Sequence, residues 1–376
     1  MQVRTCFWSL LSVSCMALFA CEDDQHEPVS PQGLQALPEV APSPSDNPLS
    51  QEKIELGRLL FWDPILSGHQ DVACATCHHP DFGYGDGLAV SIGVGGRGLG
   101  PDRLRDPNVP LVPRNAPTVL HTGFNGWTGT SAPADPSFAP MFWDNREVSL
   151  EAQALGPIRS DVEMRGDAYP EEEAVDRVVE RIAAIPEYAT LFAEAFDEDP
   201  SLAVSEQNLA RAIAAFERHL SRPNSPYDRW LAGDETALTA SQRRGLDAFH
   251  GTGCAECHSG PMFSDFELHR LNVPDQPGMA DEGDGQRQFR TPTLRNVALT
   301  APFMHSGRVQ TLGDAIEFYD DLEGPNLARL AQDMDVEGED EEDIEAFLRA
   351  LTDDEIDREI PQSVPSGLTP GGDIGS

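Results

Sequence analysis

The chain has 376 residues, of which 39% are hydrophobic, so it is long enough for two domains with separate cores. Its 64 acidic residues outweigh 26 basic ones and give a formal net charge of −38, which excludes nucleic acid as a partner because the chain would repel phosphates. The same charge would attract a basic protein partner, although a solvated acidic surface explains it equally well.

The N-terminus has the pattern of an export signal. A short basic segment, "MQVR", precedes an apolar run that is too short to span a bilayer, and residues 1–20 are therefore predicted to be a signal peptide. The run ends in "LFAC", which resembles the lipobox of bacterial lipoproteins and makes Cys21 the acylated residue, with ordinary secretion as the alternative. We expect a protein of the periplasm or cell envelope that contacts a membrane only through this lipid. Residues 21–46 are acidic and proline-rich, which predicts a disordered tether.

Helical periodicity appears in separated segments. Helices are predicted over 51–62, 149–156, 171–185 and 205–220, whereas residues 64–140 are rich in Gly, Pro and Asp and show no sustained period. A loop this long inside a compact domain is explained if it wraps a bulky cofactor. Strand signals are sparse, so the expected fold class is all-α with long ordered loops.

A helix, a loop and the motif C-x-x-C-H occur in this order twice along the chain, which suggests two related domains. We place an N-terminal domain at residues 47–235 and a C-terminal domain at residues 236–352. Residues 353–376 are short, polar and end in "GGDIGS", which predicts a flexible tail.

The cysteines identify the chemistry. Apart from Cys21 and two cysteines in the signal, the chain has four, in "CATCH" and "CAECH": Cys74, Cys77, Cys254 and Cys257. Two thiols at this spacing can add across the two vinyl groups of one haem, and the next histidine becomes the axial iron ligand. A zinc site would pool both cysteine pairs and usually omit the histidines, and a thioredoxin-like centre would need a βαβ setting. The motifs therefore predict two c-type haems, with His78 and His258 as iron ligands.

Several separated motifs then carry a family resemblance: "ELGRLLFWDP", "CATCHHPDFGYGDG", "SIGVGG", "PRNAPTV", "FWDNREVSLEAQALGPI", "SPYDRWLAGD", "GCAECHSGPMFSD" and "RTPTLRNVALTAPFMHSGRVQTLGDAIEFY". From about residue 50 to 350 the sequence resembles the bacterial di-haem cytochrome c peroxidase family, which includes MauG-type enzymes. The resemblance implies two cytochrome c-like domains, each with one covalent haem.

At the first haem, the resemblance implies an open peroxide site. Family members that need reductive activation have a capping histidine directly after "SIG", and here that position is Val94, which cannot bind iron. His69 and His121 are alternative caps at positions that the family does not use.

The segment "FWDNREVSLEAQALGPIRSDVEM" resembles the family's distal pocket. It implies that Trp143 lies between the haems, that Gln153 and Pro157 line the pocket, and that Glu163 is the acid–base group. Cleavage of peroxide needs a group that moves a proton from one oxygen to the other. A solvated charge at Glu163 and ordinary packing of Trp143 are the competing interpretations.

At the second haem, the resemblance places a ligand fourteen residues after His305, which is Tyr319. Helical spacing agrees, because Thr311 and Asp314 resemble a capping box and Tyr319 then shares one face with Leu312, Ala315 and Ile316. The alternatives are a core tyrosine, or Met304 or Met279 as the ligand.

The remaining residues carried by the resemblance form supporting sites. Asn115, Thr300 and Pro302 match a calcium site between the domains, where oxygen ligands suit a hard cation. Arg290 and Arg295 are candidates to bind haem propionates, since a guanidinium forks onto a carboxylate, with surface salt bridges as the alternative.

Three functions are compatible with these residues. The first is a peroxidase that reduces hydrogen peroxide to water at the N-terminal haem, with electrons relayed through the C-terminal haem from a basic donor such as cytochrome c or a cupredoxin. The second is a MauG-like enzyme that oxidises Trp or Tyr of a partner protein; Val94 and Tyr319 favour it, but Thr252 stands where MauG has tryptophan. The third is a di-haem electron carrier, against which the Glu163 segment argues. A homodimer is compatible with all three.

Overall fold

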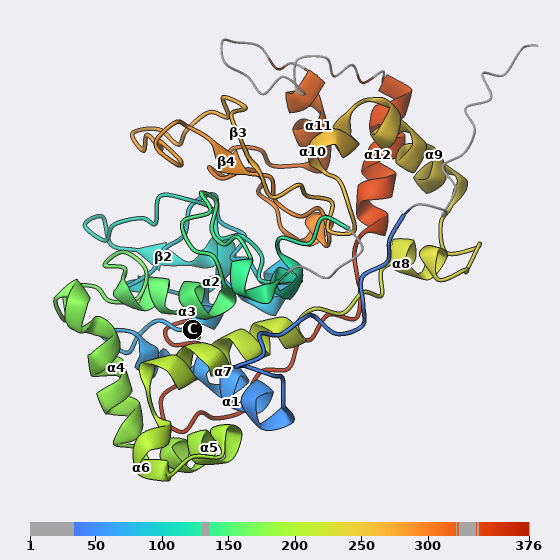
Figure 1. Ribbon diagram of the computed structural model, residues 1–376. Helices are drawn as coiled ribbons and strands as arrows, with labels where there is room; N and C mark the ends of the chain where they lie inside the picture. Colours follow the sequence, from blue (N-terminus) through green and yellow to red (C-terminus); the bar gives the residue numbers. More distant parts are fainter. Residues whose placement is uncertain (1–33, 130–134, 321, 323–335, 337, 376) are drawn as a thin grey trace, which may run out of the picture.

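The computed structural model describes residues 34–129, 135–320, 322, 336 and 338–375, and helices dominate it (Figure 1). The helices are α1 (Gln51–Trp62), α2 (Cys74–Cys77), α3 (Leu150–Arg159), α4 (Ala174–Ala183), α5 (Pro186–Phe196), α6 (Pro200–Ala203), α7 (Glu206–His219), α8 (Pro226–Leu231), α9 (Ala240–Gly251), α10 (Cys254–Cys257), α11 (Leu312–Asp320) and α12 (Gly338–Ala350). Strands among the described residues form two short antiparallel pairs: β1 (Gly96–Arg97) with β2 (Leu104–Arg105), and β3 (Leu268–His269) with β4 (Phe289–Arg290). The expected helix-rich architecture with long loops is confirmed at this level.

The helices begin where side-chain caps satisfy their first amides. The hydroxyl oxygens of Ser50 and Ser205 accept hydrogen bonds from the third residue of α1 and of α7, and Thr239 does the same for α9. The helices predicted around 51–62, 149–156, 171–185 and 205–220 all form, with shifts of a few residues at their ends.

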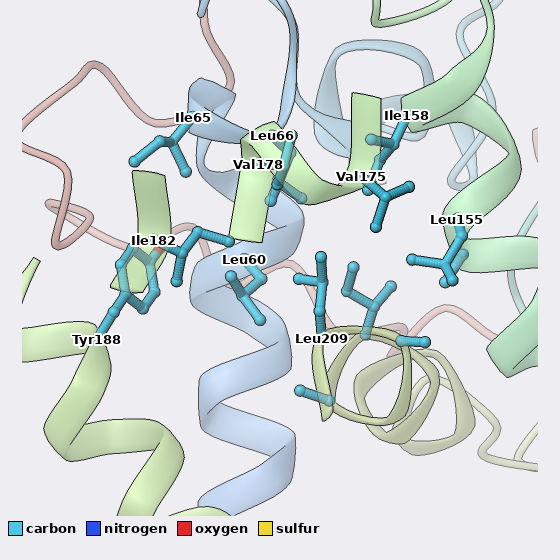
Figure 2. Close-up of a cluster of buried hydrophobic side chains, with 14 of the residues drawn as sticks. Leu60, Ile65, Leu66, Leu155, Ile158, Val175, Val178, Ile182, Tyr188 and Leu209 are labelled. Carbon is cyan, nitrogen blue, oxygen red and sulfur yellow. The ribbon is translucent and has the colours of Figure 1, made fainter. Parts of the chain in front are cut away.

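The N-terminal lobe, residues 47–220, packs around α1 and α7. Its core side chains point toward one another in Figure 2, with Leu60 from α1, Leu209 from α7 and Val178 from α4 among them. The two central helices approach closely at Gly57, where a Cβ atom would overlap the backbone oxygen of Ala212. This contact explains why α1 carries a glycine at its midpoint despite the cost to helix stability.

The C-terminal lobe repeats this arrangement with α9 and α12. Gly245 of α9 lies against the backbone oxygen of Asp343 near the middle of α12, so a glycine again permits close helix packing. An aromatic cluster fills the core, made by Phe249, Phe263 and Phe347 with Tyr227. Tyr227 lies on α8, so the predicted domain limit at residue 235 was wrong. The lobe starts near residue 225, because α8 buries its aromatic side chains in this core.

The predicted flexible tail is also wrong. Residues 353–375 run back from α12 to the N-terminal lobe, as the red trace in Figure 1 shows. The amide of Gly371 donates to the carbonyl of Trp62, and the hydroxyl of Thr76 donates to the carbonyl of Gly371. The tail therefore closes over the first cysteine motif. Backbone hydrogen bonds and a few apolar side chains such as Val364 order it, and neither gives a periodic pattern in the sequence.

The end of the predicted tether is packed as well. Leu37 and Ala41 are buried against Phe124, Met262 and Phe266, so residues 34–46 are not a disordered linker. The predicted signal peptide, Cys21 and the first part of the tether lie outside the described residues. No helix in the described part of the chain is long and apolar enough to cross a membrane.

Candidate functional site

The first cysteine motif forms the short helix α2 and presents His78 at its end. Cys74 and Cys77 form no disulfide bond within the described part of the chain. The Nδ1 atom of His78 lies 3.1 Å from the carbonyl oxygen of Tyr84. A carbonyl only accepts, so Nδ1 carries the hydrogen and Nε2 keeps its lone pair. Burial lowers the pKa of His78, partly offset by this hydrogen bond, which keeps the ring neutral.

The second motif repeats this geometry on α10. The Nδ1 atom of His258 lies 2.9 Å from the carbonyl oxygen of Phe263, and burial again lowers the pKa of the imidazole. Each histidine lines a pocket with its two cysteines. A neutral imidazole oriented through Nδ1 beside two cysteines is the donor set that a c-type haem requires. The residues therefore fit the group.

One other set of possible metal ligands occurs in the described part of the chain. Cys257, Asp265 and His269 place one donor atom each within 4.8 Å of one another. His269 and Asp265 already bind each other at 2.7 Å. The set shares Cys257 with the second haem motif, where the cysteine becomes a thioether, so it does not form an independent site.

The first pocket brings together the side chains that sequence analysis assigned to peroxide chemistry. Gln153, Pro157 and Glu163 line it together with His78. Pro157 lies inside α3 and lacks the amide that would bind the carbonyl of Gln153. The side-chain Oε1 of Gln153 is buried and has no hydrogen-bond partner among the described residues.

Glu163 is the acid of this pocket. Burial raises the pKa of its carboxyl group, and the positive charge of Arg146 and a hydrogen bond with Ser160 counteract part of the rise. A carboxyl group with a raised pKa binds a proton more strongly than an ordinary carboxyl group, and a general acid–base group must both hold and release a proton.

The positions considered for a capping ligand lie away from this pocket wall. Val94 is buried in the core of the N-terminal lobe. His69 lies on the surface, with its Nε2 2.7 Å from a carboxylate oxygen of Asp167. His121 is buried near Arg295, and burial lowers its pKa to about 3. Neither histidine lines the first pocket, so neither alternative cap has support from the geometry.

The second pocket is closed by one face of α11. Leu312, Ala315, Ile316 and Tyr319 all line it, and Thr311 and Asp314 form the predicted reciprocal cap at the start of the helix. The described residues offer the hydroxyl of Tyr319 no hydrogen-bond partner, and its surroundings raise its pKa by desolvation. Met304 also lines this pocket, whereas Met279 does not.

Trp143 and Arg290 lie on the wall that the two pockets share. The amide of Arg290 donates to the carbonyl of Trp143 at 2.7 Å, and its Nε donates to the carbonyl of Phe142 at 3.0 Å. Burial lowers the pKa of Arg290 to about 10 and leaves it a cation at neutral pH. A buried cation between two haem pockets suits a propionate partner.

Arg295 is placed differently from the prediction. Its Nη1 lies 2.9 and 3.0 Å from the two carboxylate oxygens of Asp228, and its Nε donates to the carbonyl of Pro261. The pair is buried and lines neither pocket, so Arg295 forms a structural ion pair and not a surface salt bridge.

The three residues predicted for calcium all line the second pocket. Asn115 donates from Nδ2 to the carbonyl of Leu88, which leaves its Oδ1 as the acceptor atom available to a cation. Thr300 and Pro302 follow the short turn at Val297–Leu299, and Pro302 is preceded by a cis peptide bond.

Sequence reasoning missed most of the acids that line the first pocket, Glu217 and Asp281 among them. Glu217 on α7 is buried and lines this pocket; its spacing of four residues from Ile213, on the apolar face of the helix, was the available signal. Asp281 belongs to the C-terminal lobe and yet lines the same pocket. Nothing local in the sequence indicates that placement.

Known proteins match this chain along most of its length. The family model for di-haem cytochrome c peroxidase matches residues 51–236. The methylamine utilization protein MauG of Methylorubrum extorquens is 35% identical, covering 89% of each chain, and the cytochrome c551 peroxidase of Pseudomonas aeruginosa is 34% identical, covering 85% of this chain and 84% of its own. The crystal structure of a MauG-like protein associated with microbial copper homeostasis aligns with a TM-score of 0.69 and 30% identity, over 85% of this chain and 95% of its own. The chain therefore belongs to the di-haem cytochrome c peroxidase family of oxidoreductases.

Proposed function

We propose that the protein reduces hydrogen peroxide to water in the pocket of His78, with electrons that a small redox protein delivers at the pocket of His258. The observation that carries the proposal is the convergence of Gln153, Pro157 and Glu163 on one pocket with His78, together with Trp143 on the wall toward the second pocket. Haem iron, when bound at each histidine, supplies the redox chemistry that the side chains alone lack.

The protein side chains manage the protons. Reduction of peroxide to two waters consumes two protons as well as two electrons. Glu163 takes the proton from one peroxide oxygen and returns it to the other, so that the leaving oxygen departs as water. Its raised pKa suits this role, because the carboxyl group binds a proton more strongly than an exposed carboxylate does. The unpartnered Oε1 of Gln153 can accept a hydrogen bond from peroxide and orient it.

The second pocket is suited to electron transfer because a protein side chain could act there as a second iron ligand, which leaves no position for peroxide. Tyr319 supplies a ligand oxygen there, and Arg290 neutralises propionate charge between the pockets. The acidic surface favours a basic donor such as cytochrome c. We further propose that each lobe is a cytochrome c-like domain and that the protein is exported and anchored through Cys21.

A MauG-like oxidation of a partner protein is the second candidate. The free hydroxyl of Tyr319 in the second pocket favours it, because MauG resembles this chain in having tyrosine there. At the position of the MauG tryptophan, Thr252 donates to the carbonyl of Ala248 and provides no aromatic ring. The peroxidase is therefore the better supported of the two.

The test is rapid mixing of the ferric holoprotein with hydrogen peroxide, followed by steady-state turnover with reduced cytochrome c. We expect an immediate spectral reaction without pre-reduction, and oxidation of the cytochrome at a rate that depends on peroxide. Glu163→Gln should slow the reaction by about a hundredfold or more, whereas Glu172→Gln, which changes an exposed acid that lines neither pocket, should not. A Glu163→Gln variant with unchanged rates would refute the proposal. Oxidised Trp or Tyr in a co-purified exported protein, without cytochrome turnover, would favour the MauG-like function.

We also propose that Asn115, Thr300 and Pro302 hold a calcium ion between the lobes. Oxygen ligands of this kind suit calcium. Removal of calcium with a chelator should slow turnover and change the haem spectra, and added calcium should restore both. Unchanged spectra and turnover in the fully chelated protein would show that calcium is not required.

A further inference from the structure

Four charged side chains form a continuous chain from the first pocket to the C-terminal lobe. Arg146 and Arg114 bind opposite oxygens of Asp144, each at 2.8 Å. Arg114 then contacts both oxygens of Asp281, with Nε at 2.6 Å and Nη2 at 2.8 Å. The chain therefore alternates in charge and joins two lobes whose residues lie far apart in sequence.

The inner links of this chain are sheltered from water. Arg114, Asp144 and Asp281 keep only 17%, 12% and 10% of their side-chain surface exposed, against 48% for Arg146. The fork between Arg114 and Asp281 has the bidentate geometry of the stronger guanidinium–carboxylate pairs. The amide of Gly283 also donates to Asp281 at 2.8 Å and fixes the carboxylate in its loop. Such links hold a definite geometry, unlike exposed salt bridges.

Arg146, at the end of the chain, faces the proposed acid. Its guanidinium lies 3.6 Å from the centre of the Phe142 ring and lines the first pocket, as Glu163 does. Asp281 also lines this pocket, although it belongs to the C-terminal lobe. The first pocket is thus completed by a loop from the other lobe.

The loop that begins at Asp281, residues 281–289, also contacts the second pocket. Arg114 lies 5.5 Å from the centre of the Phe289 ring, and Phe289 stacks on His305 at 3.5 Å between ring centres. Both rings line the second pocket. A shift of the 281–289 loop would therefore move residues that line both pockets.

We propose that Asp281 is a positioning residue that acts through Arg114 and Asp144 to hold Arg146 against the first pocket. The C-terminal lobe thereby sets the charge that Glu163 faces during the reaction with peroxide. This inference rests on the proposed role of Glu163. The other groups that face Glu163 are the carboxylate of Asp161, the hydroxyl of Ser160 and the sulfur of Cys77, and none of them belongs to the chain of ion pairs.

The test compares Asp281→Asn with Asp284→Asn in the holoprotein. Both variants remove one negative charge from the same loop, but Asp284 only accepts hydrogen bonds from the amides of Gln286 and Gln288, which asparagine can still accept through Oδ1. Asp281→Asn should slow the reaction of the ferric protein with peroxide about tenfold at neutral pH. The rising limb of its pH profile should move to higher pH, because Glu163 loses a nearby positive charge. Asp284→Asn should keep the wild-type profile.

Two further measurements separate positioning from general damage. Arg146→Gln should shift the pH profile in the same direction, and the double variant Asp281→Asn/Arg146→Gln should shift it no further, because both act through one group. Hydrogen exchange should become faster at residues 141–147 in Asp281→Asn, where Met141 and Glu147 pair through their backbones. Additive shifts, or a wild-type profile with unchanged exchange, would overturn the inference. If Glu163→Gln itself reacts at the wild-type rate, the proposed function fails first.

Discussion

The indole Nε1 of Trp143 donates a 2.9 Å hydrogen bond to the backbone carbonyl of Asn115 on the wall shared by the two pockets. The amide of Asn115 in turn donates to the carbonyl of His305 at 2.8 Å, and the edge of the indole faces the His305 ring with 6.4 Å between ring centres. Three segments from both lobes thus fix the orientation of one aromatic ring. This fixed ring is an aromatic π-system between the pockets of His78 and His258.

Trp143→Leu should therefore slow turnover with a reduced donor and leave the rate of the initial reaction with peroxide unchanged. The substitution removes the aromatic ring but keeps the wall apolar, so the first pocket retains Glu163 and Gln153. We expect a drop in steady-state oxidation of cytochrome c, with the initial reaction of the ferric protein close to wild type in stopped-flow spectra. Trp127→Leu is the matched control, because Trp127 lines neither pocket. Equal rates for both variants would assign Trp143 to packing.

Tyr319→Phe should change the spectrum of the second haem alone. The substitution removes the one oxygen that α11 directs into that pocket, and the ring still fills the space. We expect altered ligand-field bands in the near-infrared or electron paramagnetic resonance spectrum. Tyr188→Phe is a control, since it breaks a 2.7 Å hydrogen bond with Asp63 in the N-terminal core and should lower stability by about 1–3 kcal/mol without a spectral change. An unchanged second-haem spectrum in Tyr319→Phe would leave Met304 as the ligand to test.

The features predicted well from sequence are those set by short-range spacing. The two C-x-x-C-H motifs fix their own local geometry, because the helix of four residues and the following histidine occupy one turn. The cap at Thr311 and the inward face that ends at Tyr319 follow from helical periodicity, and the structure has both.

The features missed depend on partners distant in sequence. Arg295 is paired with Asp228, 67 residues away, and a basic residue does not reveal which acid it will meet. The apolar side chains of the tail are widely spaced and show no periodicity, so the sequence does not reveal that Val364 is buried in the core or that Gly371 binds Trp62. Asp281 reaches the first pocket only because two lobes pack together, which no local pattern encodes.

Asp357→Asn should weaken the attachment of the tail at neutral pH. The two terminal nitrogens of the Arg58 guanidinium, Nη2 and Nη1, lie 2.7 and 3.1 Å from the two carboxylate oxygens of Asp357. Burial alone would raise the pKa of Asp357, but hydrogen bonds with His219 and Arg58 outweigh it and hold the pKa well below its usual range. A carboxylate with a depressed pKa stabilises the folded state above the unfolded pKa, near 4, and loses this contribution as the pH falls.

The expected loss at pH 7 is about 2 kcal/mol in the free energy of unfolding, measured as a lower thermal midpoint of the holoprotein. The difference from wild type should shrink as the pH falls below about 4, where Asp357 of the unfolded chain begins to take up a proton while the folded protein keeps it ionised. Glu359→Gln is the control, because Glu359 is 73% exposed and its oxygen lies 4.0 Å from Arg58. Equal midpoints for the two variants at pH 7 would show that the ion pair does not hold the tail.

Glu217→Gln should remove a destabilising effect of alkaline pH. Glu217 is 4% exposed on α7, its Oε2 has no hydrogen-bond partner among the described residues, and burial raises its pKa to about 8. The folded state therefore binds a proton that the unfolded state releases near pH 4.5, so stability falls as the pH rises between these two values. The variant should match wild type at acidic pH and exceed its stability above pH 8, by about 4 kcal/mol at most. Glu206→Gln on the same helix, where the acid is 48% exposed, should follow the wild-type curve. Parallel curves of thermal midpoint against pH for wild type and Glu217→Gln would show that Glu217 is already ionised in the folded protein, which would place a compensating cation or ordered water beside it in the first pocket.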